Sequence, residues 1–127
     1  MLRENWNYRR GDIYKANLNP YIGSEQGGTR PVIVLQNNVG NYFSSTLVVA
    51  PLTSKVYNKK NIPTHYVIKN VPKLDEESLA LLEQITTIDK ERIIEYIGKV
   101  SKEDMTGIEE AIKISLGFEI PVEIEAP

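Results

Sequence analysis

Cysteine is missing from the 127-residue sequence, and histidine occurs once. The lack of thiols excludes disulfide frameworks, zinc–thiolate sites, iron–sulfur clusters and cysteine nucleophiles. A single imidazole excludes catalysis by a pair of histidines. The sequence contains no HExxH, P-loop, EF-hand or clustered carboxylate pattern. We therefore expect no metal site and no cofactor.

Long apolar runs are also scarce. The longest, such as residues 47–52, are far shorter than a membrane span, and residues 1–8 lack the apolar core of a signal peptide. We expect a cytoplasmic protein with no membrane contact. The length predicts one domain over residues 1–127, with a flexible N-terminal segment (1–8) and a C-terminal tail (119–127) outside its core.

The net charge of −2 hides an uneven distribution. Residues 1–70 contain nine Lys and Arg against three Asp and Glu, a net +6, whereas residues 71–127 contain six against fourteen, a net −8. A basic half on an acidic chain indicates a local site for a polyanion, because general coating of nucleic acid favours a strongly basic domain. Ordinary variation of surface charge is the alternative.

Short β-rich segments separated by polar connections fill most of the chain. They predict strands over 12–18, 31–36, 46–53, 64–69, 78–87 and 94–100, and thus a mainly β sandwich or small barrel. Residues 101–117 differ, because a capping-box-like start at Ser101 is followed by apolar residues at helical spacing. We expect an amphipathic C-terminal helix that Gly117 ends, and a short helical turn after Asp89.

Three connections are long for a compact domain: 19–29, 37–45 and 55–63. Loops of this length are often functional. The third contains Lys55, Lys59 and Lys60, whose ammonium groups can contact phosphates without reading a base sequence. Solvated loop lysines are the alternative interpretation.

Arg30 follows the first long loop, at the entrance of an expected strand. Gly27 and Gly28 precede it, and Pro31 and an apolar run at 32–35 follow it. A guanidinium in this place offers a planar fork of donors to a phosphate and stays charged at physiological pH. For such a segment alone, a solvated loop arginine is the alternative.

Five segments in a fixed order resemble one family, and together they cover about residues 9–118. They are Arg-Gly-Asp-Ile-Tyr at 10–14, the loop and strand entrance at 23–31, Leu-Gln-Asn-Asn at 35–38, Pro-Thr-His at 63–65 and Leu-Glu-Gln-Ile at 82–85. The chain resembles the MazF/PemK toxins, the endoribonuclease halves of bacterial type II toxin–antitoxin pairs. The resemblance implies an SH3-like β-barrel of the MazF/PemK/CcdB type, with short helices, and a homodimer.

The same resemblance assigns roles to three residues. Arg30 matches the family's catalytic arginine, which stabilises the pentacovalent transition state. Thr53 matches a catalytic threonine whose hydroxyl hydrogen-bonds the phosphate, although a threonine at a strand end is ordinarily structural. Glu25 matches a glutamate implicated in some relatives, as a general base or as a residue that orients Arg30. A salt bridge that orders the loop is the alternative role of Glu25.

Substrate contacts are expected from polar side chains in the loops and near the strand ends. These side chains can contact phosphates or base edges, and they are Ser24, Gln26, Gln36, Asn37, Lys59, Lys60, Glu83 and Gln84. Tyr21, Tyr42 and Tyr57 can stack on unpaired bases, unless they belong to the core. His65 is expected to have a structural or surface role. Many relatives carry arginine where this chain has Thr86, so the RNA sequence that is cut stays open.

The resemblance implies a metal-independent, sequence-specific endoribonuclease that cuts single-stranded RNA and leaves a 2′,3′-cyclic phosphate and a 5′-hydroxyl. RNA supplies its own 2′-hydroxyl nucleophile, so such an enzyme has to align it, stabilise charge and move protons. A cognate MazE-like antitoxin would neutralise it by lying along the basic groove. The alternative is a non-catalytic toxin of the same fold, such as a gyrase-directed poison or an inactive RNA-binding relative.

Overall fold

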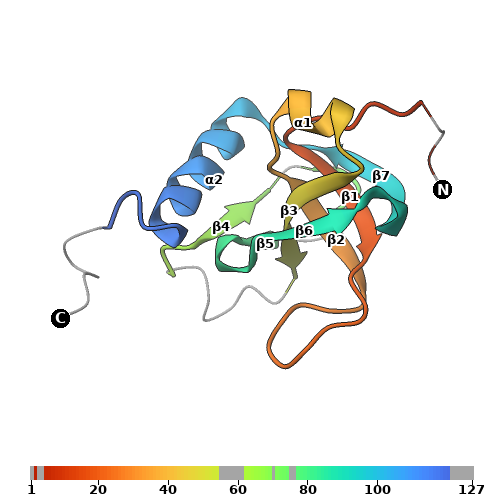
Figure 1. Cartoon of the computed structure of the whole chain (residues 1–127). Coiled ribbons are helices and arrows are strands. Elements are labelled where there is room, and N and C mark those ends of the chain that lie inside the picture. Colours follow the sequence, from red (N-terminus) through yellow and green to blue (C-terminus); the bar gives the residue numbers. More distant parts are fainter. Residues whose placement is uncertain (1, 3–4, 55–61, 70, 75–76, 121–127) are drawn as a thin grey trace.

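Figure 1 shows the chain, whose structure is a computed structural model that describes residues 2, 5–54, 62–69, 71–74 and 77–120. The strands are β1 (Asp12–Asn17), β2 (Thr29–Val34), β3 (Thr46–Thr53), β4 (His65–Ile68), β5 (Ser78–Leu81), β6 (Thr86–Asp89) and β7 (Ile93–Lys99). The α-helices are α1 (Asn38–Phe43) and α2 (Lys102–Ser115), and the 3-10 helices are η1 (Leu82–Gln84) and η2 (Lys90–Arg92).

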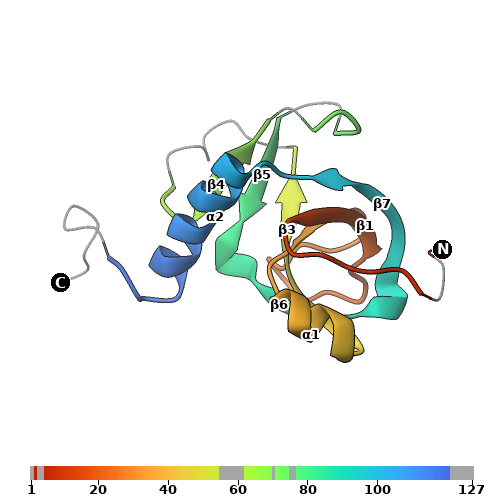
Figure 2. The same ribbon diagram turned by 90° about the horizontal axis from the view of Figure 1, so that it is seen from above.

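The strands form one antiparallel sheet in the order β4-β5-β3-β2-β1-β7, with β6 also paired to β3. The central strand is β3, because its first half pairs with β6, its middle with β2, and Leu52 and Thr53 with β5. Seen from above, the sheet curls like a barrel, and η2 carries the chain directly from β6 into β7 (Figure 2). The mainly β, barrel-like fold with a C-terminal helix is therefore confirmed.

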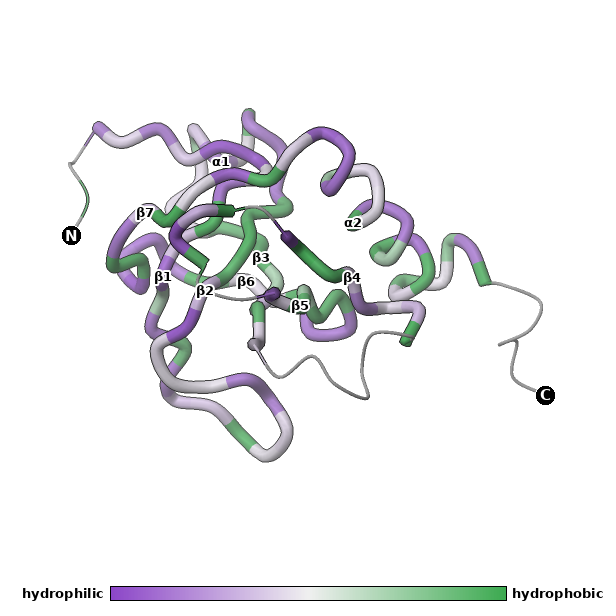
Figure 3. Tube along the Cα trace, turned by 180° about the vertical axis from the view of Figure 1, so that it is seen from behind, coloured by the Kyte–Doolittle hydropathy of each residue, from purple (hydrophilic) through white to green (hydrophobic). Residues whose placement is uncertain are grey.

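Alternating side chains of the curled sheet fill two apolar clusters. Ile13 and Ile33 belong to one cluster, together with the buried residues Ile108 and Ala111 of α2. The neighbouring residue Tyr14 belongs to the other cluster, because successive strand residues point to opposite faces. Figure 3 shows how the apolar stretches gather in the central strands. Burial on both faces makes β1, β2 and β3 the rigid part of the molecule.

The helical predictions after β6 are confirmed. The Ser101 hydroxyl accepts a hydrogen bond from Asp104 N at 3.0 Å at the start of α2, and Gly117 has a φ of +81° just beyond its end. The predicted short turn is η2, where the Asp89 carboxylate accepts a hydrogen bond from Glu91 N at 2.8 Å.

The segment 37–45, expected as a loop, contains α1 instead. This helix begins at Asn38 because the Asn37 side chain accepts a hydrogen bond from Gly40 N at 2.8 Å. Its six residues are too few to show a helical period in the sequence. A cap and tertiary packing therefore decide the structure of this segment.

The predicted strand 78–87 is split into β5 and β6 by η1. Leu82 is fully buried, its N–H donates to Thr64 O at 2.9 Å, and its carbonyl accepts a hydrogen bond from Ser115 Oγ at 2.7 Å. These contacts with the start of β4 and the end of α2 use the backbone groups that a continuous strand would pair. The interruption places Glu83 and Gln84 at a bend of the sheet.

The N-terminal segment, expected to be flexible and outside the core, packs against it. Leu2, Trp6 and Tyr8 contact the cluster around Tyr14, and the rings of Trp6 and Tyr96 lie 5.5 Å apart. Trp6 and Tyr8 bury large apolar rings in this contact, which stabilises it. These three side chains therefore pack on the core, contrary to expectation. The flexibility expected of residues 1–8 stays a prediction, and 121–127 of the expected tail lie outside the described part.

A buried carboxylate ties the N-terminal segment to β1. Asp12 is 4% exposed, and its Oδ2 accepts hydrogen bonds from Tyr14 Oη at 2.6 Å and from Arg9 N at 2.9 Å. Trp6 Nε1 donates to Tyr14 Oη at 2.8 Å. Burial, followed by the hydrogen bond to Asp12, raises the pKa of the Tyr14 hydroxyl above its usual range. The hydroxyl thus stays protonated and donates to the carboxylate.

We predict that Tyr14→Phe lowers the free energy of unfolding by about 1–3 kcal/mol, because it removes a donor from a buried carboxylate. Chemical denaturation measures the change. Tyr66→Phe is the matched control, since Tyr66 Oη donates to the half-exposed carboxylate of Asp104 at 2.7 Å, which water can solvate after the change. Equal costs for the two substitutions would contradict the role given to Asp12.

Candidate active site

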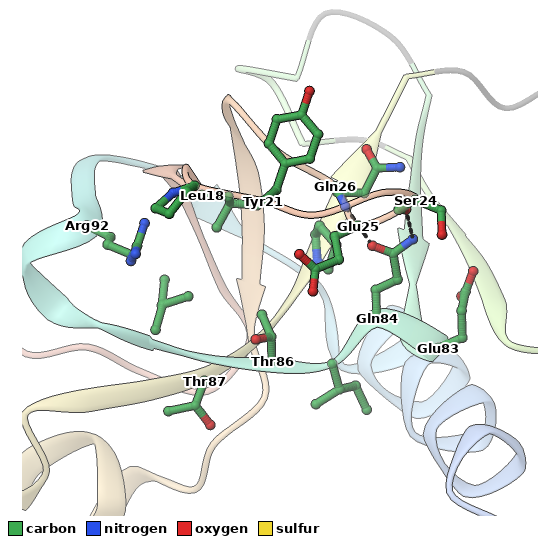
Figure 4. Close-up of a pocket in the computed structure, with 14 residues that line it drawn as sticks. Leu18, Tyr21, Ser24, Glu25, Gln26, Glu83, Gln84, Thr86, Thr87 and Arg92 are labelled. Carbon is green, nitrogen blue, oxygen red and sulfur yellow. Dashed lines mark hydrogen bonds between the residues drawn. The ribbon is translucent and has the colours of Figure 1, made fainter.

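A cleft of about 760 Å³ lies between the β1–β2 loop (residues 18–28) and the segment that runs from η1 to η2 (Figure 4). The loop lines one side, Pro51 of β3 contributes to the lining, and η1, β6 and η2 line the other side. The lining residues are Leu18, Pro20, Tyr21, Ser24, Glu25, Gln26, Pro51, Glu83, Gln84, Ile85, Thr86, Thr87, Ile88 and Arg92. Three regions far apart in the sequence thus meet at one surface.

The base of the loop is closed by backbone and side-chain hydrogen bonds. Leu18 N donates to Gly28 O at 2.9 Å, and Gly28 N donates to the Asn19 side chain at 2.9 Å. Gly28 has a φ of +73°, a conformation that favours glycine. Across the cleft, Arg92 Nη1 donates to Asn17 O at 3.0 Å and also to Asn19 O. The η2 helix therefore holds the start of the loop.

The tip of the loop is held by Gln84 of η1. Gln84 Oε1 accepts a hydrogen bond from Gln26 N at 2.9 Å, and Gln84 Nε2 donates to Ser24 O at 3.4 Å. Glu25 stabilises the same turn, since its Oε1 accepts a hydrogen bond from Ile22 N at 2.6 Å. The loop thus has a defined shape with one anchor on each side of the cleft.

Arg30 connects this loop to the centre of the sheet. Its Nε donates to Gly27 O at 2.8 Å, and its Nη1 donates to Leu52 O at 3.4 Å. Leu52 immediately precedes Thr53, the last residue of β3, which is 8% exposed. Of the two expected catalytic residues, Arg30 therefore contacts the backbone at the residue before Thr53.

Glu25 lies exposed in the cleft, and its carboxylate accepts a hydrogen bond from the backbone of Ile22. It orders the loop by this hydrogen bond, where the expected alternative was a salt bridge. Glu83 accepts a hydrogen bond from His65 Nε2 at 2.8 Å, and the His65 side chain is only 4% exposed. His65 thus has a structural partner, in line with its expected role.

The remaining expected contact residues are not all at the cleft. Gln36 Nε2 donates to Thr46 O at 3.0 Å and Asn37 caps α1, which lies at the opposite end of the molecule from the β1–β2 loop (Figure 1). Ser24, Gln26, Glu83 and Gln84 line the cleft. Of the tyrosines, Tyr21 lines it and Tyr42 lies on α1. Lys59, Lys60 and Tyr57 lie outside the described residues.

The described lining of the cleft is not basic. Its charged side chains are Glu25, Glu83 and Arg92. The expected basic groove therefore depends on Arg30 beside the cleft and on the lysines of residues 55–60, which the structure does not describe. Within the described ranges, no three His, Asp and Glu side chains come together in a way that could hold a metal ion. In the same ranges, every helix is too short or too polar to cross a membrane.

Comparison with known proteins identifies the family of the chain. A family model described as the PemK-like, MazF-like toxin of type II toxin–antitoxin systems matches residues 9–116. The chain belongs to this PemK/MazF toxin family. The match covers the whole sheet, the β1–β2 loop and α2.

Solved structures share the fold of this toxin. MazF from Deinococcus radiodurans is 22% identical, with a TM-score of 0.76 over 89% of this chain and 99% of that one. An endoribonuclease from a mycobacterial species is 23% identical, with a TM-score of 0.73 over 94% and 100%. A mycobacterial endoribonuclease in complex with its cognate antitoxin is 24% identical, with a TM-score of 0.74 over 90% and 99%.

Sequence reasoning missed Arg92 and Asn19 in this toxin. Arg92 is 75 residues from Asn17 along the chain, and the acceptors of its guanidinium are backbone carbonyls, which carry no sequence signal. Asn19 acts through a side chain that closes the loop base. The only available hint was the length of the 19–29 connection, which indicated a functional loop without naming its anchors.

We predict that Gly27→Ala opens the β1–β2 loop without lowering global stability. An added Cβ would lie 1.8 Å from Tyr21 Cδ1, so the ring must leave its place on the Gly27 backbone. Limited proteolysis within residues 19–29 should become faster, while the free energy of unfolding stays within about 0.5 kcal/mol because Gly27 and Tyr21 lie outside both apolar clusters. In a Tyr21→Ala background the same change should have little further effect. Persistence of its full effect there would contradict the contact with Tyr21.

Proposed function

We propose that this toxin is a metal-independent endoribonuclease that cuts single-stranded RNA at specific sequences. The observation that supports the proposal most is the hydrogen bond from Arg30 to the carbonyl of Leu52, the residue before Thr53 at the end of a buried strand. A phosphate bound there would meet a fork of cationic donors and a hydroxyl. Such donors stabilise the negative charge that develops during phosphoryl transfer.

The chemistry uses the substrate's own nucleophile. The 2′-oxygen of the RNA attacks the adjacent phosphorus, a 2′-O–P bond forms, and the P–O5′ bond breaks. The 2′-hydroxyl loses its proton and the leaving O5′ gains one, so the products are a 2′,3′-cyclic phosphate and a 5′-hydroxyl. Arg30 stabilises the pentacovalent transition state, and Thr53 hydrogen-bonds a non-bridging oxygen. Glu25 lines the neighbouring cleft and is the carboxylate that could accept the 2′-proton.

A mechanism without a metal fits the proposed residues. The Arg30 guanidinium and the Thr53 hydroxyl would stabilise the charge on the phosphate, which is the task of the Lewis acid in a metal-dependent nuclease. Single-stranded RNA fits the cleft, since unpaired bases can stack on aromatic rings and pair with side-chain amides. Tyr21 offers a ring that is 52% exposed at the cleft. Ser24, Gln26, Glu83 and Gln84 offer polar groups beside it. Gln36, Asn37, Lys59 and Lys60 remain expected contacts of a longer RNA.

We further propose that the toxin works in the cytoplasm as a homodimer and that a MazE-like antitoxin inhibits it. A related endoribonuclease has been solved in complex with its cognate antitoxin, and MazE–MazF complexes are known from Deinococcus radiodurans. In this proposal the antitoxin covers the surface that includes Arg30, and so competes with RNA.

The alternative is a non-catalytic toxin of the same fold. A gyrase-directed poison or an inactive RNA-binding relative would not need a guanidinium and a hydroxyl at one place. The contact of Arg30 with Leu52 O favours the nuclease.

We predict that Arg30→Ala lowers the cleavage rate by about 10²–10³, because single donors to a developing negative charge contribute this much in other active sites. Arg30→Lys should also be strongly impaired, since an ammonium cannot reproduce the planar fork. Single-turnover cleavage of a labelled RNA measures the rate, with circular dichroism as the control for folding. A folded Arg30→Ala protein that cuts at the original rate would contradict the assignment.

We predict that Thr53→Val lowers the single-turnover rate more than it lowers RNA affinity. The substitution keeps the β-branched shape that fits β3 and removes the hydroxyl that would contact the phosphate. Thr46→Val, at the opposite end of β3 from Thr53, is the matched control for the loss of a strand threonine hydroxyl. If the rate for Thr53→Val is unchanged, Thr53 is structural.

We predict that RNA and antitoxin exclude each other. An uncleavable RNA should raise the apparent dissociation constant of the antitoxin in proportion to its own concentration, because both need the Arg30 surface. RNA binding should also weaken as salt rises, through release of counterions from the phosphates. A ternary complex with undiminished affinities would show that inhibition occurs at another surface.

A further inference from the structure

We propose that Gln84 is a positioning residue for Arg30: it holds the tip of the β1–β2 loop so that the Gly27 carbonyl directs the guanidinium. The proposal rests on the function proposed above, because it deepens the role of Arg30 in that reaction. It gives Gln84 a role different from the substrate contact that its sequence context predicted.

Gln84 lies on a well-anchored element of the fold. It ends η1, which begins at the fully buried residue Leu82. The backbone of Leu82 is held from both sides, by Thr64 O at 2.9 Å and by Ser115 Oγ at 2.7 Å. The bend of the chain at η1 is therefore tied to both β4 and α2. A side chain on such an element can hold a loop in place.

The grip of Gln84 on the loop is bidentate. Its carbonyl oxygen accepts a hydrogen bond from Gln26 N at 2.9 Å, and its amide nitrogen donates to Ser24 O at 3.4 Å (Figure 4). The oxygen and the nitrogen of the Gln84 side-chain amide thus bind backbone groups of two loop residues, Gln26 and Ser24. Two contacts limit rotation of the loop tip as well as its translation.

A movement of the loop tip would be transmitted to Arg30 through the peptide between Gln26 and Gly27. Gln26 is covalently bonded to Gly27, whose carbonyl accepts a hydrogen bond from Arg30 Nε at 2.8 Å. The ring of Tyr21 packs on Gly27 at the place that a Cβ would occupy. A tip released from Gln84 would tilt the Gly27 carbonyl and with it the guanidinium. Small misplacements of a catalytic group can cost much of the rate.

A positioning role and a direct contact with RNA have different kinetic consequences. If Gln84 acts through Arg30, its loss lowers the rate of the chemical step and leaves RNA affinity and the cut site unchanged. If Gln84 reads a base, its loss weakens binding or moves the cut site. The two roles can therefore be separated by measuring rate, affinity and cut site in the same variants.

The test compares Gln84→Ala with Gln84→Glu on a labelled RNA that contains a mapped cut site. We expect Gln84→Ala to lower the single-turnover rate about tenfold, with the RNA dissociation constant within about twofold and the cut site unchanged. Gln84→Glu keeps the acceptor for Gln26 N but loses the donor to Ser24 O, so it should recover part of the rate. Thr106→Ala is the matched control, because it removes one side-chain hydrogen bond to a backbone carbonyl, at 3.0 Å, within α2.

A second measurement does not depend on activity. Hydrogen exchange by NMR of Gln26 N–H and Arg30 Nε–H should become faster in Gln84→Ala and increase less in Gln84→Glu. Unchanged exchange of Arg30 Nε–H in folded Gln84→Ala would overturn the proposal, whatever the activity. A weaker affinity or a moved cut site at an unchanged rate would overturn it too. Absence of RNA cleavage by the wild-type protein, in contrast, would refute the proposed function, and full cleavage by Arg30→Ala would refute the role of Arg30 in it. Either result would leave the exchange measurement to decide whether Gln84 positions the Arg30 side chain.

Discussion

The guanidinium of Arg30 joins the β1–β2 loop at the cleft to β3, the central strand of the sheet, and the candidate site depends on this connection. It donates to a loop carbonyl, Gly27 O, and to a strand carbonyl, Leu52 O. A guanidinium has five N–H donors, so these two hydrogen bonds fix its orientation while other donors can face a phosphate. The half-buried setting strengthens such interactions, because less water competes for the donors.

The strand side of this connection is stable because β3 is paired along its whole length. Its last residue, Thr53, pairs with Leu79 of β5 and has little exposed surface. The loop side is held from two points, by Gln84 at the tip and by Arg92 at the base. The site thus combines a hydroxyl on a rigid strand with a cation whose direction depends on a loop. This arrangement suits a reaction in which the protein mainly aligns RNA and stabilises charge.

Much of the fold could be predicted from the sequence, because strand periodicity and the caps at Asp89 and Ser101 are local signals. The helix α1 was missed since its decisive feature is a single cap by Asn37, and the break at Leu82 was missed since it depends on hydrogen bonds from distant segments. At the site, Arg30 could be predicted from its loop and strand context, and Thr53 only from family resemblance. The contact of Gln84 with Gln26 spans 58 residues between side chain and backbone, which no local pattern encodes.

The central claim is that the protein positions RNA for attack by its own 2′-hydroxyl, without a metal. The most direct test uses an RNA with a mapped cut site and the same RNA carrying one 2′-deoxynucleotide on the 5′ side of that bond, both in excess EDTA. The account predicts that the all-RNA substrate is cut to a 2′,3′-cyclic phosphate and a 5′-hydroxyl and that the deoxy substrate stays intact. Cleavage of the deoxy substrate, or activity that disappears in EDTA and returns with a divalent ion, would contradict it.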